Sequence, residues 1–173
     1  MRSQFLLVPA ALIAAAPVQA WQYISVDEAQ RAMFPGATFK LHTITMDTNQ
    51  FYSLMKASNV TVWSSTIRAW KASTGGWFFL DQVLGRDDHI TYAVALNDAG
   101  IVTSVEIIDC IATYDQIRRP YWLAQFKGKT TSSGNLVEQV EIISGVSLSS
   151  EHVAEGVRRI LAAHALFFAQ KKG

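Results

Sequence analysis

Two apolar runs in the middle of the chain constrain its fold most. Residues 90–96 and 101–108 are rich in β-branched and aromatic side chains, and the four residues Asn97-Asp98-Ala99-Gly100 separate them. Such a polar, glycine-ended connection between two β-prone runs is typical of a hairpin. Because a single hairpin is barely stable in water, the pair is expected to belong to a larger antiparallel sheet.

Other segments predict the rest of that sheet and its covering helices. Period-two runs indicate further strands, and Ser73-Thr74-Gly75-Gly76 is a turn signal between two of them. Ser25 and Glu28 have the spacing of a capping box, and Pro120 suits the first turn of a helix. The expected class is α+β, a single small domain with an antiparallel sheet flanked by helices. The expected strands are 39–46, 67–71, 77–84, 90–96 and 101–108. One helix is expected to follow the Ser25 cap, to carry Ala29, Ala32 and Met33, and to stop at Phe34-Pro35-Gly36; the other expected helices are 48–57, 121–126 and 151–168.

Composition excludes several classes of protein. The chain has 173 residues, half of them hydrophobic, which suits one domain with a real core. Its 15 basic and 14 acidic residues form no basic stripe, so nucleic acid is not an expected partner. The single cysteine, Cys110, excludes an internal disulfide and is expected to be a buried thiol. The four histidines are scattered, so no metal site is predicted.

The first twenty residues have the pattern of a secretory signal. Arg2 supplies a positive start, residues 5–16 form a short apolar run, and Val18-Gln19-Ala20 offers a cleavage site. The apolar run is short for a membrane span. We therefore expect residues 1–20 to be a signal peptide and residues 21–173 to be an exported, periplasmic domain. An uncleaved anchor, which would leave the protein membrane-associated, remains the alternative.

The stretch from Glu141 to Ser150 predicts a binding site for an anion. A β-prone run, Glu141-Ile142-Ile143, is followed by a small, hydroxyl-rich turn and then by an amphipathic helix expected from Glu151 to about Phe168. A helix N-terminus offers unpaired N–H groups and a positive dipole end, which suit a phosphate. The turn supplies Gly145 for tight geometry and the hydroxyls of Ser144, Ser147, Ser149 and Ser150. An ordinary serine-rich turn with a helix cap is the alternative reading.

The last helix is expected to bury one face. Val153, Val157 and Ile160 mark that face, together with Leu161, His164 and Phe168. Glu155 and Arg159 are expected on the outside. His164 is interpreted as a core histidine.

The same stretch resembles the flavinylation motif of the FMN-binding domain family. In that pattern Glu141 takes the acid position, Ser144 and Gly145 the small pair, Val146 the alanine position, and Ser147 the hydroxyl acceptor, with Leu148, Ser149 and Ser150 following. The chain differs from the usual pattern in having Glu for Asp, Val for Ala and Ser for Thr. A second run also matches small family members in order and spacing: Tyr114, Ile117-Arg118, Trp122, Gln125-Phe126 and Gly128-Lys129.

The resemblance covers about residues 90–161 and implies a function. The family includes periplasmic flavin subunits of sodium-pumping and related electron-transport complexes, such as the flavin-carrying subunit of the sodium-translocating NADH:quinone reductase. It implies that a flavin transferase joins FMN through its phosphate to Ser147, and that the protein passes electrons to redox partners, among them a membrane electron-transport complex. Tyr114 and Arg118 are candidates for contacting the flavin ring, as a flat wall and a positive charge.

Two other functions remain open from the sequence. One is a noncovalent FMN or phosphate-ligand module, in which Ser147 merely hydrogen-bonds. The other is a serine hydrolase, because residues 145–149 nearly spell the G-x-S-x-G elbow, although Ser149 replaces the last glycine. A hydrolase would need a histidine beside Ser147, and the two that follow it, His152 and His164, lie in one predicted helix.

Overall fold

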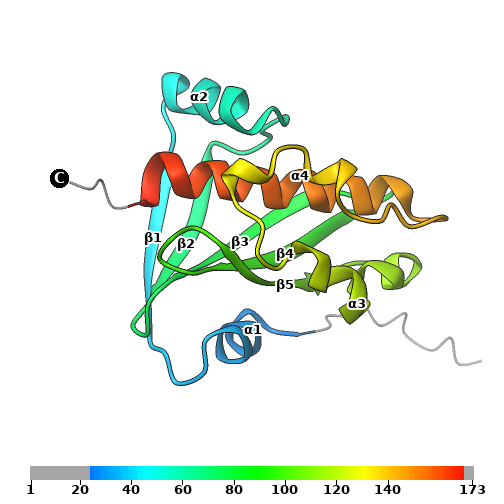
Figure 1. Ribbon diagram of the computed structural model, residues 1–173, viewed down its shortest axis with the longest axis horizontal. Coiled ribbons are helices and arrows are strands. Elements are labelled where there is room, and N and C mark those ends of the chain that lie inside the picture. The colour runs from blue at the N-terminus through cyan, green and yellow to red at the C-terminus, as the bar shows by residue number, and fades with distance from the viewer. Residues whose placement is uncertain (1–23, 170–173) are drawn as a thin grey trace, which may run out of the picture.

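The computed structural model describes residues 24–169, which form a five-stranded antiparallel sheet with helices on both faces (Figure 1). The strands follow one another in space in chain order: β1 (Phe39–Thr45), β2 (Thr66–Ala72), β3 (Trp77–Leu84), β4 (His89–Leu96) and β5 (Val102–Asp109). The predicted α+β class is confirmed. The predicted signal, residues 1–20, lies outside the described residues.

The hairpin predicted from residues 90–108 is the pair β4–β5. Val94 lies opposite Val105, and a register shift between Ala95 and Leu96 allows the turn to close. Asn97 makes that turn: its side-chain oxygen accepts the backbone N–H groups of Ala99 and Ile101, each at 3.0 Å. Gly100 has a φ of +75°, a conformation that favours glycine. The local sequence therefore determines this turn.

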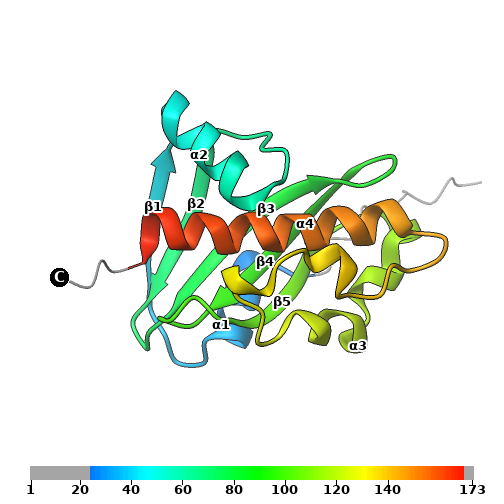
Figure 2. The same cartoon turned by 45° about the horizontal axis from the view of Figure 1, so that its top comes forward.

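Helices cover the two faces unequally. The long helix α4 (Ser147–Ala163) lies across one face with α2 (Thr48–Ser58) beside it, whereas α1 (Val26–Met33) lies on the opposite face (Figures 1 and 2). The capping box predicted at Ser25 and Glu28 is present, with both reciprocal hydrogen bonds. A second one, Asp47 with Gln50, begins α2.

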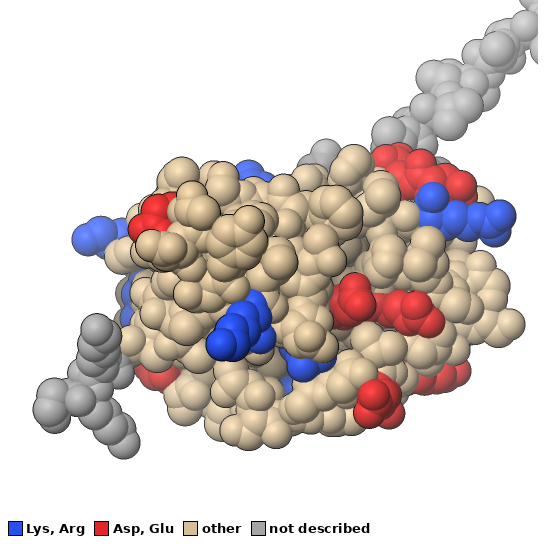
Figure 3. Space-filling model, turned by 90° about the horizontal axis from the view of Figure 1, so that it is seen from above, with Lys and Arg blue, Asp and Glu red and all other residues tan. Residues whose placement is uncertain are grey.

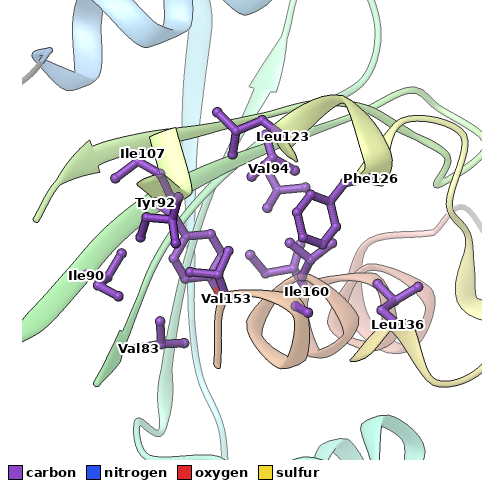
Figure 4. Close-up of a cluster of buried hydrophobic side chains, with 14 of the residues drawn as sticks. Val83, Ile90, Tyr92, Val94, Ile107, Leu123, Phe126, Leu136, Val153 and Ile160 are labelled. Atoms are coloured by element: carbon purple, nitrogen blue, oxygen red, sulfur yellow. The ribbon is translucent and has the colours of Figure 1, made fainter. Parts of the chain in front are cut away.

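The main core lies between the sheet and α4. Inward-facing side chains of β3, β4 and β5 meet Val153 and Ile160 of α4 and the ring of Phe126 (Figure 4). The buried Trp122 belongs to the same cluster. Cys110 is also in this core, which confirms the buried thiol. Burial of this much apolar surface is the principal force that holds α4 to the sheet.

Residues 111–143 form an irregular layer beside β5. Its short helices are all 3₁₀ except α3: η1 (Ala112–Arg118), α3 (Pro120–Leu123) with η2 (Ala124–Phe126) directly after it, η3 (Thr131–Ser133) and η4 (Leu136–Glu138). Pro120 occupies the first turn of α3, as predicted. Residues Gly128 and Lys129 pair with Val102 at the start of β5 through two backbone hydrogen bonds of 2.8 and 2.9 Å.

The β-prone run before the serines is not a strand, which corrects the sequence-based expectation. The backbone of Glu141 is held by side chains instead: its N–H donates to Gln125 Oε1 at 2.9 Å, and its C=O accepts the Trp122 indole N–H at 2.7 Å. These bonds satisfy the polar groups that a sheet would otherwise pair. The run therefore forms part of the layer that supports α4.

The last helix also starts earlier than predicted. It begins at Ser147 rather than Glu151 and continues past Ala163 as a π-helical turn, η5 (His164–Phe168). Val146, which precedes it, is buried and donates its N–H to Ile143 at 3.1 Å. The reversal at Gly145 is therefore complete before Ser147. Within residues 24–169, no helix is both long enough and apolar enough to cross a bilayer.

Candidate functional site

The first turn of α4 carries the candidate site. Gly145 has a φ of +88° and would have open space around a Cβ, so its backbone conformation, not crowding, favours glycine there. Val146 occupies the N-cap position and supplies no side-chain cap. Ser147 is consequently the first helical residue, and it lies on the surface.

The four serines of the stretch have different environments. Ser144 and Ser147 are exposed, and the Ser147 hydroxyl donates a long hydrogen bond of 3.4 Å to the carbonyl of Ile143. Ser150 is fully buried; its hydroxyl accepts the Ile143 N–H at 3.2 Å and lies 2.8 Å from the Ser147 carbonyl. Ser149 is also buried, at 1% exposure. Ser149 and Ser150 are therefore inaccessible to a ligand. Of the four predicted hydroxyls, those of Ser144 and Ser147 remain exposed.

The helix end retains unused hydrogen-bond donors. The first N–H groups of an α-helix have no partner within the helix. Among the described residues, no side chain caps α4, and its first turn contains no acidic residue. The Ser149 hydroxyl is likewise buried without a hydrogen-bond partner there. The positive end of a 17-residue helix thus lies beside the exposed Ser147 hydroxyl, an arrangement that suits an anion.

Other residues of the predicted motif frame this turn. Glu141 keeps its side chain exposed while its backbone is fixed by Trp122 and Gln125. Leu148 is 42% exposed directly beside Ser147. Trp122 is fully buried, so the Glu141 carbonyl is held by a residue of the hydrophobic core.

Tyr114 and Arg118, the candidate ring contacts, have structural partners. Tyr114 is buried at 3% exposure, and its hydroxyl accepts the backbone N–H of Asp87 at 2.5 Å. Its ring also lies so close to Gly85 that a Cβ there would overlap it. Arg118 forms an ion pair of 3.2 Å with Asp115. Both residues thus have partners within the fold, Tyr114 by packing and Arg118 by an ion pair, and η1, which carries them, contacts α4.

No hydrolase arrangement surrounds Ser147 in the part of the chain that the structure describes. His152 Nδ1 lies 2.5 Å from the carbonyl oxygen of Leu84. His164 is buried against the β4–β5 turn, close to Gly100, which confirms it as a core histidine. Neither imidazole is hydrogen-bonded to the Ser147 hydroxyl.

A buried polar cluster was not predicted from the sequence. Arg159, expected outside, is only 7% exposed, and it makes an ion pair of 2.5 Å with Asp81 on β3. The Tyr92 hydroxyl donates to the same carboxylate at 3.1 Å. Burial raises the pKa of Tyr92 well above its usual value, and the Asp81 charge adds to this. Burial alone would lower the pKa of Arg159, but Tyr92 and Asp81 outweigh it and raise that pKa, so the guanidinium stays charged.

Two cavities lie away from the serine turn. One, of about 490 Å³, is beside the Arg159–Asp81 pair, between α2, α4 and the sheet. The other, of about 770 Å³, is a wider hollow at the far end of α4 beside Lys71, Asp98 and His164. Residues 141–150 line neither cavity. A group attached at Ser147 would therefore begin on the surface.

Comparison with known proteins identifies the fold. No protein-family model and no curated protein matches the chain. The fold is similar to the crystal structure of NqrC from Shewanella oneidensis, with a TM-score of 0.53 over 80% of this chain and 85% of that one. Sequence identity is 16%, so the likeness establishes a shared fold.

Proposed function

We propose that the chain is an exported flavoprotein that carries FMN, esterified through its phosphate to Ser147, and passes electrons between redox partners. The observation that carries the proposal is the exposed Ser147 hydroxyl at the start of an uncapped 17-residue helix. The fold shared with NqrC, a protein of the flavin-subunit type that the motif resembles, supports the same assignment.

The residues at this turn fit the phosphate. The free N–H groups of the first turn supply donors, and the helix dipole favours negative charge at that end. Gly145 carries no side chain that would cover the turn. Together these groups would hold a phosphodiester without any metal ligand.

FMN would supply a ring that accepts and releases electrons, while the chain positions it. Ser147 would form the bond between its Oγ and the phosphorus of an activated FMN donor, presented by a flavin transferase. The hydroxyl proton and the donor's leaving group would depart in that step. Glu141, which precedes the turn, and Leu148, next to Ser147 in sequence, are exposed and are the residues that the transferase would recognise.

The proposed location is the periplasm, and the proposed partners are redox proteins. The signal-like residues 1–20 would direct the domain to the periplasm, where a tethered cofactor cannot diffuse away. Its redox partners would be proteins of a membrane electron-transport complex. The donor and acceptor would approach the surface on which α4 begins, because an attached flavin would start there.

The test is intact-mass analysis of the protein produced together with a flavin transferase. The parent chain is expected to gain one FMN minus one water, and Ser147→Ala is expected to lose the whole adduct. Ser144→Ala is the matched control, since Ser144 is also exposed but precedes the helix. It is expected to keep the adduct, as is Ser147→Thr, which retains the hydroxyl.

Denaturation separates the covalent proposal from noncovalent binding. A yellow cofactor that leaves the unfolded chain would show that Ser147 only hydrogen-bonds the phosphate. Full loading of Ser147→Ala would contradict the assignment of the acceptor. A parent chain that neither gains mass nor holds free FMN would overturn the flavoprotein proposal.

A further inference from the structure

The cavity of about 490 Å³ between the sheet, α2 and α4 is built like a ligand site. Its volume falls within the range of ~300–1,000 Å³ that is usual for small-molecule pockets. The face that carries α2 and α4 shows only scattered charged side chains (Figure 3). Most of the cavity wall is apolar: Met46, Leu54, Val62, Ile67, Phe79, Val83, Ile160 and Ala163.

Arg159 and Asp81 place one donor beside one acceptor in the polar part of that wall, which also contains Ser64, Thr66, Arg68, Gln82 and His89. Arg159 uses Nε and Nη2 on Asp81 Oδ2, whereas the hydrogen bond that its Nη1 makes in the described residues is a long one of 3.4 Å to the Thr61 carbonyl. Because Nη1 carries two N–H groups, one remains available. Asp81 Oδ1 accepts the backbone N–H of Gln82 and keeps a second lone pair, and the Asp81 side chain is 28% exposed.

An exposed tryptophan lies at the mouth of the cavity. Trp63 lines it and is 81% exposed, although Val60 and Val62 in the same segment are buried. Arg159 also holds the carbonyl of Thr61, two residues before Trp63. The segment is therefore anchored, and the indole is kept in solvent beside an apolar opening, where a flat ligand would cover it.

We infer that this cavity binds a flat heteroaromatic ring with a lactam or imide edge. The Asp81 carboxylate and the Arg159 guanidinium neutralise each other, so this pair offers matched hydrogen-bonding groups rather than a net charge; the exposed Arg68 also lines the cavity. A carbonyl of the ligand would accept the free Arg159 N–H, and the adjacent ring N–H would donate to Asp81 Oδ1. The apolar walls and Trp63 would cover the ring faces. The inference does not rest on the Ser147 ester.

Lumichrome, a fused three-ring imide without a ribityl chain or phosphate, is the probe. We expect saturable binding of one lumichrome per chain at micromolar concentration, followed by its fluorescence. Trp63→Ala is expected to weaken binding about tenfold through lost stacking. Tyr52→Ala is the matched control, because Tyr52 is an aromatic of 60% exposure that does not line the cavity. It is expected to leave the affinity unchanged.

Two further measurements test the chemistry of the site and its independence. A lumichrome derivative in which both imide-ring N–H groups are methylated is expected to bind at least about tenfold more weakly, because it cannot donate to Asp81. Ser147→Ala is expected to bind lumichrome as the parent does. The inference is overturned if lumichrome fails to bind, if Trp63→Ala binds as tightly as the parent, or if methylation changes nothing. None of these results would alter the mass test of the ester.

Discussion

The first turn of α4 and the middle of the same helix differ in how exposed and how well paired their polar side chains are. At the first turn, the Ser147 hydroxyl is exposed and the helix end is uncapped. Three turns later, Arg159 is buried and bonded to Asp81, Thr61 and Gln82. Most of the Arg159 N–H groups are thus used inside the fold and contribute to its structure, whereas the exposed Ser147 hydroxyl and the uncapped helix end are available to a ligand. The contrast separates the residues that hold the helix from those proposed to carry the cofactor.

The largest effect is expected from breaking the buried pair. Asp81→Ala would leave the Arg159 guanidinium charged and without its carboxylate inside the protein, which costs about 3–5 kcal/mol. The free energy of unfolding in urea measures this. Asp115→Ala removes the exposed ion pair with Arg118 and is expected to cost at most about 1 kcal/mol. Equal losses in the two variants would show that the middle of α4 is not held by the pair.

A second prediction concerns the contact between α4 and the Tyr92 ring. A Cβ at Gly156 would overlap the Tyr92 hydroxyl and lie 2.7 Å from its Cζ. Overpacking costs about 1–3 kcal/mol, and the better helix propensity of alanine returns up to about 1 kcal/mol. Gly156→Ala is therefore expected to destabilise the protein by about 1–2 kcal/mol in urea unfolding.

The Tyr92→Phe background sharpens that measurement. Removing the hydroxyl relieves the closest overlap, so Gly156→Ala should cost less there, and the difference between the two backgrounds is the coupling energy. A loss of the same size in both backgrounds would mean that Tyr92 does not limit the approach of α4 to β4.

Two serines of the same turn give a direct comparison. Ser150→Ala would remove the hydroxyl that accepts the Ile143 N–H in the interior, and an unsatisfied buried donor costs about 1–3 kcal/mol. Ser147→Ala, at the surface, is expected to change stability by no more than about 0.5 kcal/mol. Thermal unfolding of the unmodified proteins measures both. A larger loss for Ser147→Ala would give that residue a structural role and weaken its assignment as an acceptor.

Elements whose signals are local could be predicted from the sequence. The turn at Asn97 and Gly100, the capping box of Ser25 with Glu28, and Pro120 in the first turn of α3 all appear as expected. Each depends on residues within a few positions of one another. The five strands also agree within one or two residues, because their period-two patterns face a buried helix layer.

Features that depend on distant partners could not be predicted. Arg159 is buried because Asp81, 78 positions away, lies opposite it in the fold. The run 141–143 is β-prone but does not enter the sheet, because Trp122 and Gln125 bond to its backbone. The one local hint was the acidic Asp81 within a largely apolar strand, where an unpaired carboxylate would be costly. For Ser149 and Ser150, the hydroxyl-rich pattern carried no information about burial.

The smallest expected effect lies at the other end of α4. His164 there is buried, as Arg159 is, but one of its ring nitrogens is unpaired. It is 4% exposed, yet its Nε2 has no hydrogen-bond partner in the described part of the chain. Burial lowers the pKa of His164 below its usual value of 6.5; the nearby Lys71 charge lowers it further, and Asp98 partly opposes this. The unfolded chain therefore takes up a proton at a higher pH than the folded one. Stability is retained above about pH 6.5 and falls as the pH drops through the folded pKa.

His164→Leu is expected to remove that slope, so its stability relative to the parent should improve between about pH 6.5 and pH 5. Urea unfolding at several pH values measures the difference. His89→Gln is measured alongside as the exposed-imidazole variant, since the His89 side chain is 66% exposed. If His164→Leu keeps the slope of the parent, the imidazole is protonated inside the fold. The His164 imidazole would then have a hydrogen-bond partner, as the Arg159 guanidinium has, and would not be unpaired like the N–H groups of the first turn.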